Sequence, residues 1–151
     1  MSRTARFLAL AAALSLMPVG AALAEPLRAS KPVSLHQAVD DLTLAAANSN
    51  MVMVKIQPID SALVKRGFDD PHVRIIFIGS ETAVRWAEAA EPRLLNLLPL
   101  RLTLIQRDDI VLVLSDDFEP WRREFPDNPA NLLLRAWEYE LKVLFDDFVS
   151  Q

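Results

Sequence analysis

Two strand-like segments joined by a tight acidic turn constrain the fold more than any other feature of the sequence. Apolar and polar residues alternate over much of Leu100 to Gln106, and apolar residues return from Ile110 to Leu114, after the connection Arg107-Asp108-Asp109. So short a connection joins antiparallel neighbours, because parallel strands need a crossover of a dozen or more residues. The sequence therefore predicts an antiparallel hairpin, and with it a sheet that is mostly antiparallel or mixed.

Two further strands are predicted upstream of the hairpin. In the segment from Met51 to Ile59, the pattern predicts that Val52, Val54 and Ile56 share one face. Pro58 indicates that this strand ends there or lies at a sheet edge. The segment Val73 to Ile78 is almost entirely apolar, which predicts a central strand covered on both faces.

Amphipathic helices are predicted around these strands. Ser34 caps a helix with an apolar stripe, a second helix opens at Ser80 or Glu81, and Asn128-Pro129 begins the last one. The buried stripe of the last helix is expected to be Leu133, Trp137, Leu141, Leu144, Phe145 and Phe148. The order predicts an α+β fold, in which helices pack on a four-stranded, mostly antiparallel or mixed sheet and a helical extension follows at the C-terminus.

The first two dozen residues have the pattern of an export signal. Arg3 and Arg6 precede an apolar run, and Ala22-Leu23-Ala24 offers the small residues that a signal peptidase accepts, so cleavage is predicted between Ala24 and Glu25. The apolar run is about half as long as a membrane-spanning helix. The predicted divisions are a signal peptide at 1–24, a linker at 25–33, an α+β domain at 34–118 and a helical extension at 119–151. The predicted location is the periplasm, or outside the cell, with membrane contact only during export.

Composition excludes several chemistries. The 151 residues include no cysteine, which excludes disulfides, thiol catalysis and iron–sulfur ligation. There are 20 acidic and 16 basic side chains, and removal of Arg3 and Arg6 with the signal would lower the net charge from −4 to −6. This balance argues against nucleic acid as the partner.

Three segments carry a resemblance to a known family. They are Leu35-His36-Gln37-Ala38-Val39, the strand Val73 to Gly79 leading into a helix, and Glu91 to Leu104 with its Leu-Pro-Leu-Arg step. From Ser34 to about Phe118 the chain resembles the domain of unknown function 302 family. The resemblance implies an α+β domain that often forms a dimer, and it implies no reaction. The chain has Gly79-Ser80-Glu81 where the family often has Gly-Asn-Pro.

Aromatic residues gather near the C-terminus. Six of the eleven lie from residue 121 onward: Trp121, Phe125, Trp137, Tyr139, Phe145 and Phe148. They either dock the final helix on the sheet or line a ligand groove or dimer seam. Trp121, Phe125 and Trp137 are therefore candidate ligand or interface residues.

The two histidines are the remaining candidates. His36 stands one turn before Asp40, and His72 follows Pro71. A zinc or copper site needs three or four ligands, so a metal would need Met51 or Met53 in addition. Ordinary surface positions are the alternative. Ten of the twelve aspartates occur in adjacent pairs, which predicts solvated turns and caps because neighbouring carboxylates point apart.

No catalytic, cofactor-binding or metal-binding residue can be assigned from these patterns. The leading hypothesis is a non-enzymatic periplasmic accessory or binding module that forms a homodimer and meets a basic periplasmic protein through electrostatic steering. The alternatives are a carrier of a small apolar ligand or metal, and a hydrolase or isomerase whose site is dispersed along the chain.

Overall fold

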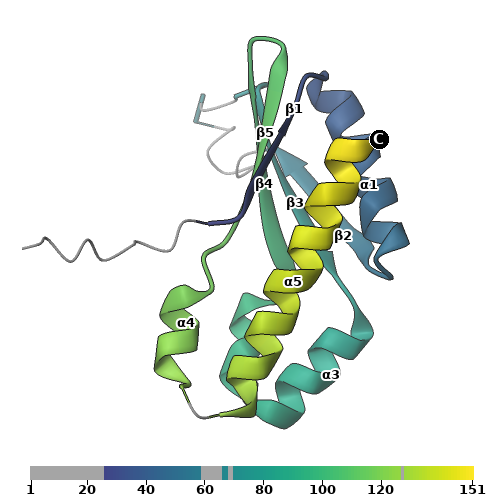
Figure 1. Cartoon of the computed structure of the whole chain (residues 1–151). Helices are drawn as coiled ribbons and strands as arrows, with labels where there is room; N and C mark the ends of the chain where they lie inside the picture. The colour runs from purple at the N-terminus through teal and green to yellow at the C-terminus, as the bar shows by residue number, and fades with distance from the viewer. Residues whose placement is uncertain (1–25, 59–65, 68–69, 127) are drawn as a thin grey trace, which may run out of the picture.

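One five-stranded antiparallel sheet organises the molecule (Figure 1). The computed structural model describes residues 26–58, 66–67, 70–126 and 128–151, with the side chains of Gln57 and Pro58 left aside. The strands lie in the order β1-β5-β4-β3-β2. Their bounds are β1 Arg28–Lys31, β2 Val52–Pro58, β3 Val73–Gly79, β4 Leu100–Arg107 and β5 Ile110–Ser115. The predicted signal peptide and its cleavage site at Ala24 and Glu25 fall outside the described residues.

The predicted hairpin is present, but the predicted count of four strands is wrong. In the hairpin, Arg107 pairs with Ile110, and Asp108 adopts φ 52°, a left-handed conformation that aspartate tolerates better than most residues. The fifth strand, β1, lies in the segment predicted as a linker, where Ala29 pairs with Val113 of β5. A four-residue edge strand held by backbone hydrogen bonds needs no apolar alternation of its own, so the pattern could not reveal it.

Helices α1, α3 and α5 begin where the capping residues predicted them. They are α1 Leu35–Asn48, α3 Glu81–Ala90, α4 Glu119–Glu124 and α5 Pro129–Ser150, with a 3₁₀ helix, η1, at Pro92–Leu97. Ser34 Oγ accepts a hydrogen bond from Gln37 N, Ser80 Oγ from Ala83 N, and the Asn128 side chain from Ala130 N. Each cap satisfies a backbone donor that the first helical turn leaves without a partner.

Helices α1 and α5 pack against each other on one face of the sheet (Figure 1). The predicted stripe of α5, from Leu133 to Phe148, is buried in this layer. The largest fully buried side chains include Leu42, Ile76, Ile78, Leu102, Leu104, Leu134, Trp137 and Phe148. None of the described helices is both long and apolar enough to cross a membrane.

The opposite face of the sheet is only half-buried, and it carries several apolar side chains beside Thr103 and the exposed Arg101. On β3, Ile76 and Ile78 are buried in the core, while Ile75 and Phe77 point the other way and are partly exposed. Ile105 on β4 and Leu112 and Leu114 on β5 continue this outer face. The prediction that β3 is covered on both faces is wrong. Helices α1 and α5 cover only the face that carries Ile76 and Ile78, and the opposite face of β3 stays partly exposed. The partly exposed apolar residues of that opposite face are called the outer sheet face below.

Strand β2 is an edge strand, as Pro58 indicated, but its predicted side-chain alternation is interrupted. Met53 pairs with Ile78 and Lys55 with Phe77, so Val54 is an extra residue in a β-bulge. Val52 lies opposite Gly79, whereas Ile56 lies opposite Ile76 on the other face. The prediction that Val52, Val54 and Ile56 share one face is therefore wrong, because a single inserted residue reverses the alternation that follows it.

A largely buried ion pair ties β1 to α1. Lys31 Nζ lies 2.5 Å from Asp41 Oδ2, and Gln37 Nε2 donates to Asp41 Oδ1 at 2.6 Å. Burial opposes ionisation of Asp41, but the hydrogen bonds from Lys31 and Gln37 outweigh it and lower the pKa of Asp41 below its usual value. Asp41 is thus an exception to the prediction that the paired aspartates are solvated.

Candidate functional site

An open apolar groove lies between the edge strand β2, the first turn of α3 and η1. Its volume is about 410 Å³. It is lined by Val52, Val54, Gly79, Ser80, Glu81, Val84, Leu95, Leu98 and Pro99. We call it the α3 groove.

The start of α3 fixes one end of this groove. Strand β3 ends at Gly79, and the chain enters the helix at once because Ser80 caps it through Ala83 N at 3.1 Å. A Cβ added at Gly79 would lie 3.6 Å from Pro99 Cβ, an ordinary contact distance. The backbone at Gly79 therefore forms the floor of the groove without being crowded there.

The walls of the α3 groove are aliphatic and exposed. Val52 is 63% exposed, Val54 57% and Val84 44%. The polar side chains among its lining are those of Ser80 and Glu81, both at the N-terminus of α3. A mostly apolar hollow of several hundred Å³ with a few convergent polar groups is typical of small-molecule sites.

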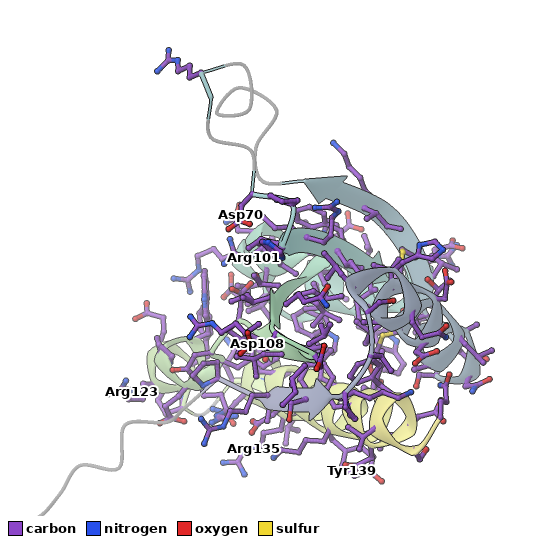
Figure 2. All side chains as sticks on the ribbon, turned by 90° about the horizontal axis from the view of Figure 1, so that it is seen from above. Asp70, Arg101, Asp108, Arg123, Arg135 and Tyr139 are labelled. Atoms are coloured by element: carbon purple, nitrogen blue, oxygen red, sulfur yellow. The ribbon has the colours of Figure 1, made fainter. Side chains whose placement is uncertain are left out.

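A second, more polar hollow of about 460 Å³ adjoins the groove at Leu98 and Pro99. Arg101 forms an ion pair with Asp116 in its wall, and Trp121 and Phe77 contribute aromatic surface. In Figure 2, Arg101 lies on the side of the molecule away from Arg135 and Tyr139, which project from the outer side of α5.

The three predicted aromatic candidates have different surroundings. Trp121 is partly buried, lines the polar hollow and stacks on Phe125, with ring centroids 6.4 Å apart. Phe125 is buried, with the Arg93 guanidinium 4.5 Å from its ring centroid. Trp137 is buried beside Phe118, at 6.5 Å between ring centroids. Phe125 and Trp137 therefore belong mainly to the core, although Trp137 also lines a small hollow between α3 and α5, and Trp121 lines the polar hollow.

The two histidines lie at surface positions on separate elements. His36 Nε2 is 3.7 Å from Asp40 Oδ2 on α1, and both side chains are exposed. His72 is held by its backbone: its N–H donates to Asp70 Oδ1, and its carbonyl accepts from Gln106 N. Within the described ranges, the structure brings together no group of three or more histidine, aspartate or glutamate side chains that could hold a metal ion.

The sequence patterns did not identify the residues of the α3 groove as site candidates. Their shared feature is an aliphatic side chain that stays exposed beside a sheet edge, and this depends on the bulge at Val54. Pro58 predicted that β2 ends there or lies at a sheet edge, and Ser80-Glu81 predicted the start of α3. The position of η1 against both elements, however, follows from tertiary packing and has no local signal.

Comparison with known proteins identifies the fold. A family described as domain of unknown function DUF302 matches residues 27–132, from just before β1 into the first turn of α5. The chain also resembles the crystal structure of an uncharacterized conserved DUF302 protein from Bacillus stearothermophilus, with a TM-score of 0.68 and 13% identity. That match covers 80% of this chain and 95% of the other. No curated protein matches the sequence.

Proposed function

The chain belongs to the DUF302 family, and from that premise we propose that it is an exported, non-enzymatic binding module that holds a small apolar molecule in the α3 groove. The observation that carries the proposal is the combination of groove volume, about 410 Å³, with an almost wholly aliphatic lining. An apolar molecule that enters such a groove gains by removing its own surface and that of the valines from water.

The side chains that line the groove restrict the kind of ligand that it can hold. Val52, Val54 and Val84 offer no hydrogen bonds from their side chains, so recognition there depends on shape and apolar contact. Ser80 and Glu81 stand together at one end, where a ligand can place a single polar group. The expected ligand is therefore predominantly apolar, with at most one polar end that can accept from Ser80 or donate to Glu81.

The test uses N-phenyl-1-naphthylamine, an uncharged apolar fluorophore. We expect saturable one-to-one binding, reported by a rise in fluorescence. Val54→Asp should weaken it at least tenfold, about 1.4 kcal/mol, because the ligand would have to desolvate a carboxylate. Val149→Asp is the matched control, since Val149 is 50% exposed near the end of α5 and Val54 is 57% exposed in the groove. Equal loss in both variants, or none in either, would contradict the proposal.

The outer sheet face supports a homodimer as a second part of the proposal. It carries Ile75, Phe77, Ile105, Leu112 and Leu114, all partly exposed. From ordinary strand rise and spacing, a face of five strands that are four to eight residues long measures on the order of 500 Å². That is somewhat less than the ~800 Å² that each partner buries in a standard interface. We therefore expect a homodimer that dissociates on dilution.

Export and a basic partner complete the proposal. Arg3, Arg6 and the apolar run after them support export, and mass spectrometry of the protein from the periplasm should give an N-terminus at Glu25. The excess of 20 acidic over 16 basic side chains supports a basic protein partner. Capture of such a partner should weaken as salt rises, because screening shortens the reach of the charges. Full-length protein in the cytosol, or capture insensitive to salt, would contradict these parts.

A further inference from the structure

A smaller hollow lies on the other side of α3 from the groove. Its volume is about 210 Å³, and it is enclosed by the end of α1, the first turns of α3 and the middle of α5. Asn50, Ser80, Thr82, Trp86, Trp137 and Glu140 are among its lining residues. We call it the Glu140 hollow. It is distinct from the groove, although Ser80 lines both.

Glu140 is a half-buried carboxyl group without a partner. Within the described part of the chain it makes no hydrogen bond or ion pair, whereas its neighbour Glu138 pairs with Arg122 and Lys142. Burial raises the pKa of Glu140 above its ordinary value, as expected for a carboxyl group without a compensating cation. Because no cation in the described part of the chain pairs with it, the Glu140 carboxylate is available to a cation supplied from outside.

The surroundings of Glu140 suit an organic cation. Trp86 lies in the same hollow and is 56% exposed, although tryptophan is a residue that folding usually hides. The face of an indole ring attracts ammonium groups through its quadrupole. The hollow also lies at the C-terminal end of α1, where Ser49 and Asn50 line it and the helix dipole is negative.

The opposing influence comes from the N-terminus of α3, whose dipole is positive. Ser80 Oγ already occupies Ala83 N, and Glu81 stands in the first turn, so this end is capped and neutralised in part. Glu81 pairs with Arg85 on α3, Glu88 is exposed, and the last turn of α1 carries no charged side chain.

We propose that the Glu140 hollow binds a small organic ammonium ion, with the Glu140 carboxylate as counter-ion and the Trp86 indole against its alkyl groups. A carboxylate and an aromatic face together recognise the charge and the apolar shell of such an ion. The carboxylate supplies the preference for the cation over a neutral molecule of the same shape, and the indole ring adds apolar contact with the alkyl groups. This site is independent of the apolar ligand proposed for the α3 groove.

The test compares choline with its uncharged isostere, 3,3-dimethylbutan-1-ol, by isothermal titration calorimetry on the full mature chain at pH 8. Wild-type protein should bind choline at least tenfold more tightly than the isostere. Glu140→Gln should remove that preference, and Trp86→Leu should weaken choline binding. Glu88→Gln is the matched control and should bind like wild type, because it removes an exposed carboxylate from α3, the helix that carries Trp86.

The pH profile supplies an independent measurement. Choline affinity should fall as the pH drops through the pKa of Glu140, because protonation removes the counter-ion, while affinity for the isostere should stay level. Equal affinity of the wild-type protein for choline and the isostere would overturn the proposal without any variant. Choline binding by Glu140→Gln at wild-type strength, or an equal loss in Glu88→Gln, would overturn it as well.

Discussion

Replacing Lys31 with methionine tests how β1 is held against α1. The Lys31 and Asp41 side chains are only 12% and 11% exposed, and Nζ lies 2.5 Å from Oδ2. Methionine keeps much of the apolar stem but leaves Asp41 as a largely buried carboxylate that retains only the hydrogen bond from Gln37. Removing one partner of a buried pair costs about 3–5 kcal/mol, and the remaining hydrogen bond places the expected loss near ~3 kcal/mol.

The assay is the free energy of unfolding in urea, with thermal melting beside it. A loss of ~3 kcal/mol corresponds to a fall of roughly 6–12 °C in Tm for a chain of this size. Lys142→Met is the matched control, because Lys142 is 55% exposed and its pair with Glu138 should contribute no more than about 0.5 kcal/mol. The double variant Lys31→Met/Asp41→Leu should recover most of the loss, since it leaves no unpaired charge.

The pH dependence separates the ion pair from simple packing. In the wild-type protein the pKa of Asp41 is lowered, so its contribution is complete above the ordinary aspartate value of 3.8 and is lost as the pH falls through the lower folded pKa. Without Lys31, burial dominates and raises the pKa of Asp41, so protonation at low pH relieves the strain. The difference between wild type and Lys31→Met should therefore be largest at pH 7 and shrink below pH 4. An equal difference at pH 7 and pH 3, or stability matching wild type at pH 7, would refute this reasoning.

Three further predictions concern the core, the outer sheet face and Glu140. Trp137→Ala should cost about 3–5 kcal/mol in urea unfolding, because the side chain is 2% exposed; a loss under 1 kcal/mol would place Trp137 outside the core. Ile105→Lys should shift sedimentation velocity to the monomer while leaving the far-ultraviolet circular dichroism unchanged, and an unaltered dimer would exclude this face. The raised pKa of Glu140 means that the stability of the wild-type protein falls as the pH rises from 4.5 through the folded pKa. Glu140→Gln should therefore unfold at a higher urea concentration than wild type at pH 8. This difference in the urea midpoint should vanish below pH 4.

Local signals explain the parts of the fold that the sequence predicts well. Ser34, Ser80 and Asn128 each cap the helix expected of them, because a short polar side chain can satisfy a helical N–H within three residues. The hairpin between β4 and β5 is similarly local, with Asp108 in the left-handed region at its turn. Such features depend on neighbouring residues alone, so a single sequence contains them.

The features that could not be predicted from the sequence depend on contacts with residues in other elements. Strand β1 exists because the β5 backbone offers it hydrogen bonds, with Ala29 opposite Val113. The bulge at Val54 reverses which residues of β2 lie on each face of the sheet, and no neighbouring residue in the sequence indicates a bulge there. The buried pair of Lys31 and Asp41 joins residues ten positions apart across two elements, and Asp41 alone resembles any other solvated aspartate.

The same reasoning explains why both candidate sites flank α3. Helices α1 and α5 occupy the covered face of the sheet, and α3 lies beyond the end of the strands (Figure 1). Its buried residues are Ala83 and Ala87, two small side chains that let the helix approach its neighbours closely. The large residues Val84 and Trp86 remain exposed, Val84 in the α3 groove and Trp86 in the Glu140 hollow. A helix anchored by alanines gains little stability from its exposed apolar side chains, so Val84 and Trp86 are free to contact the ligands proposed above.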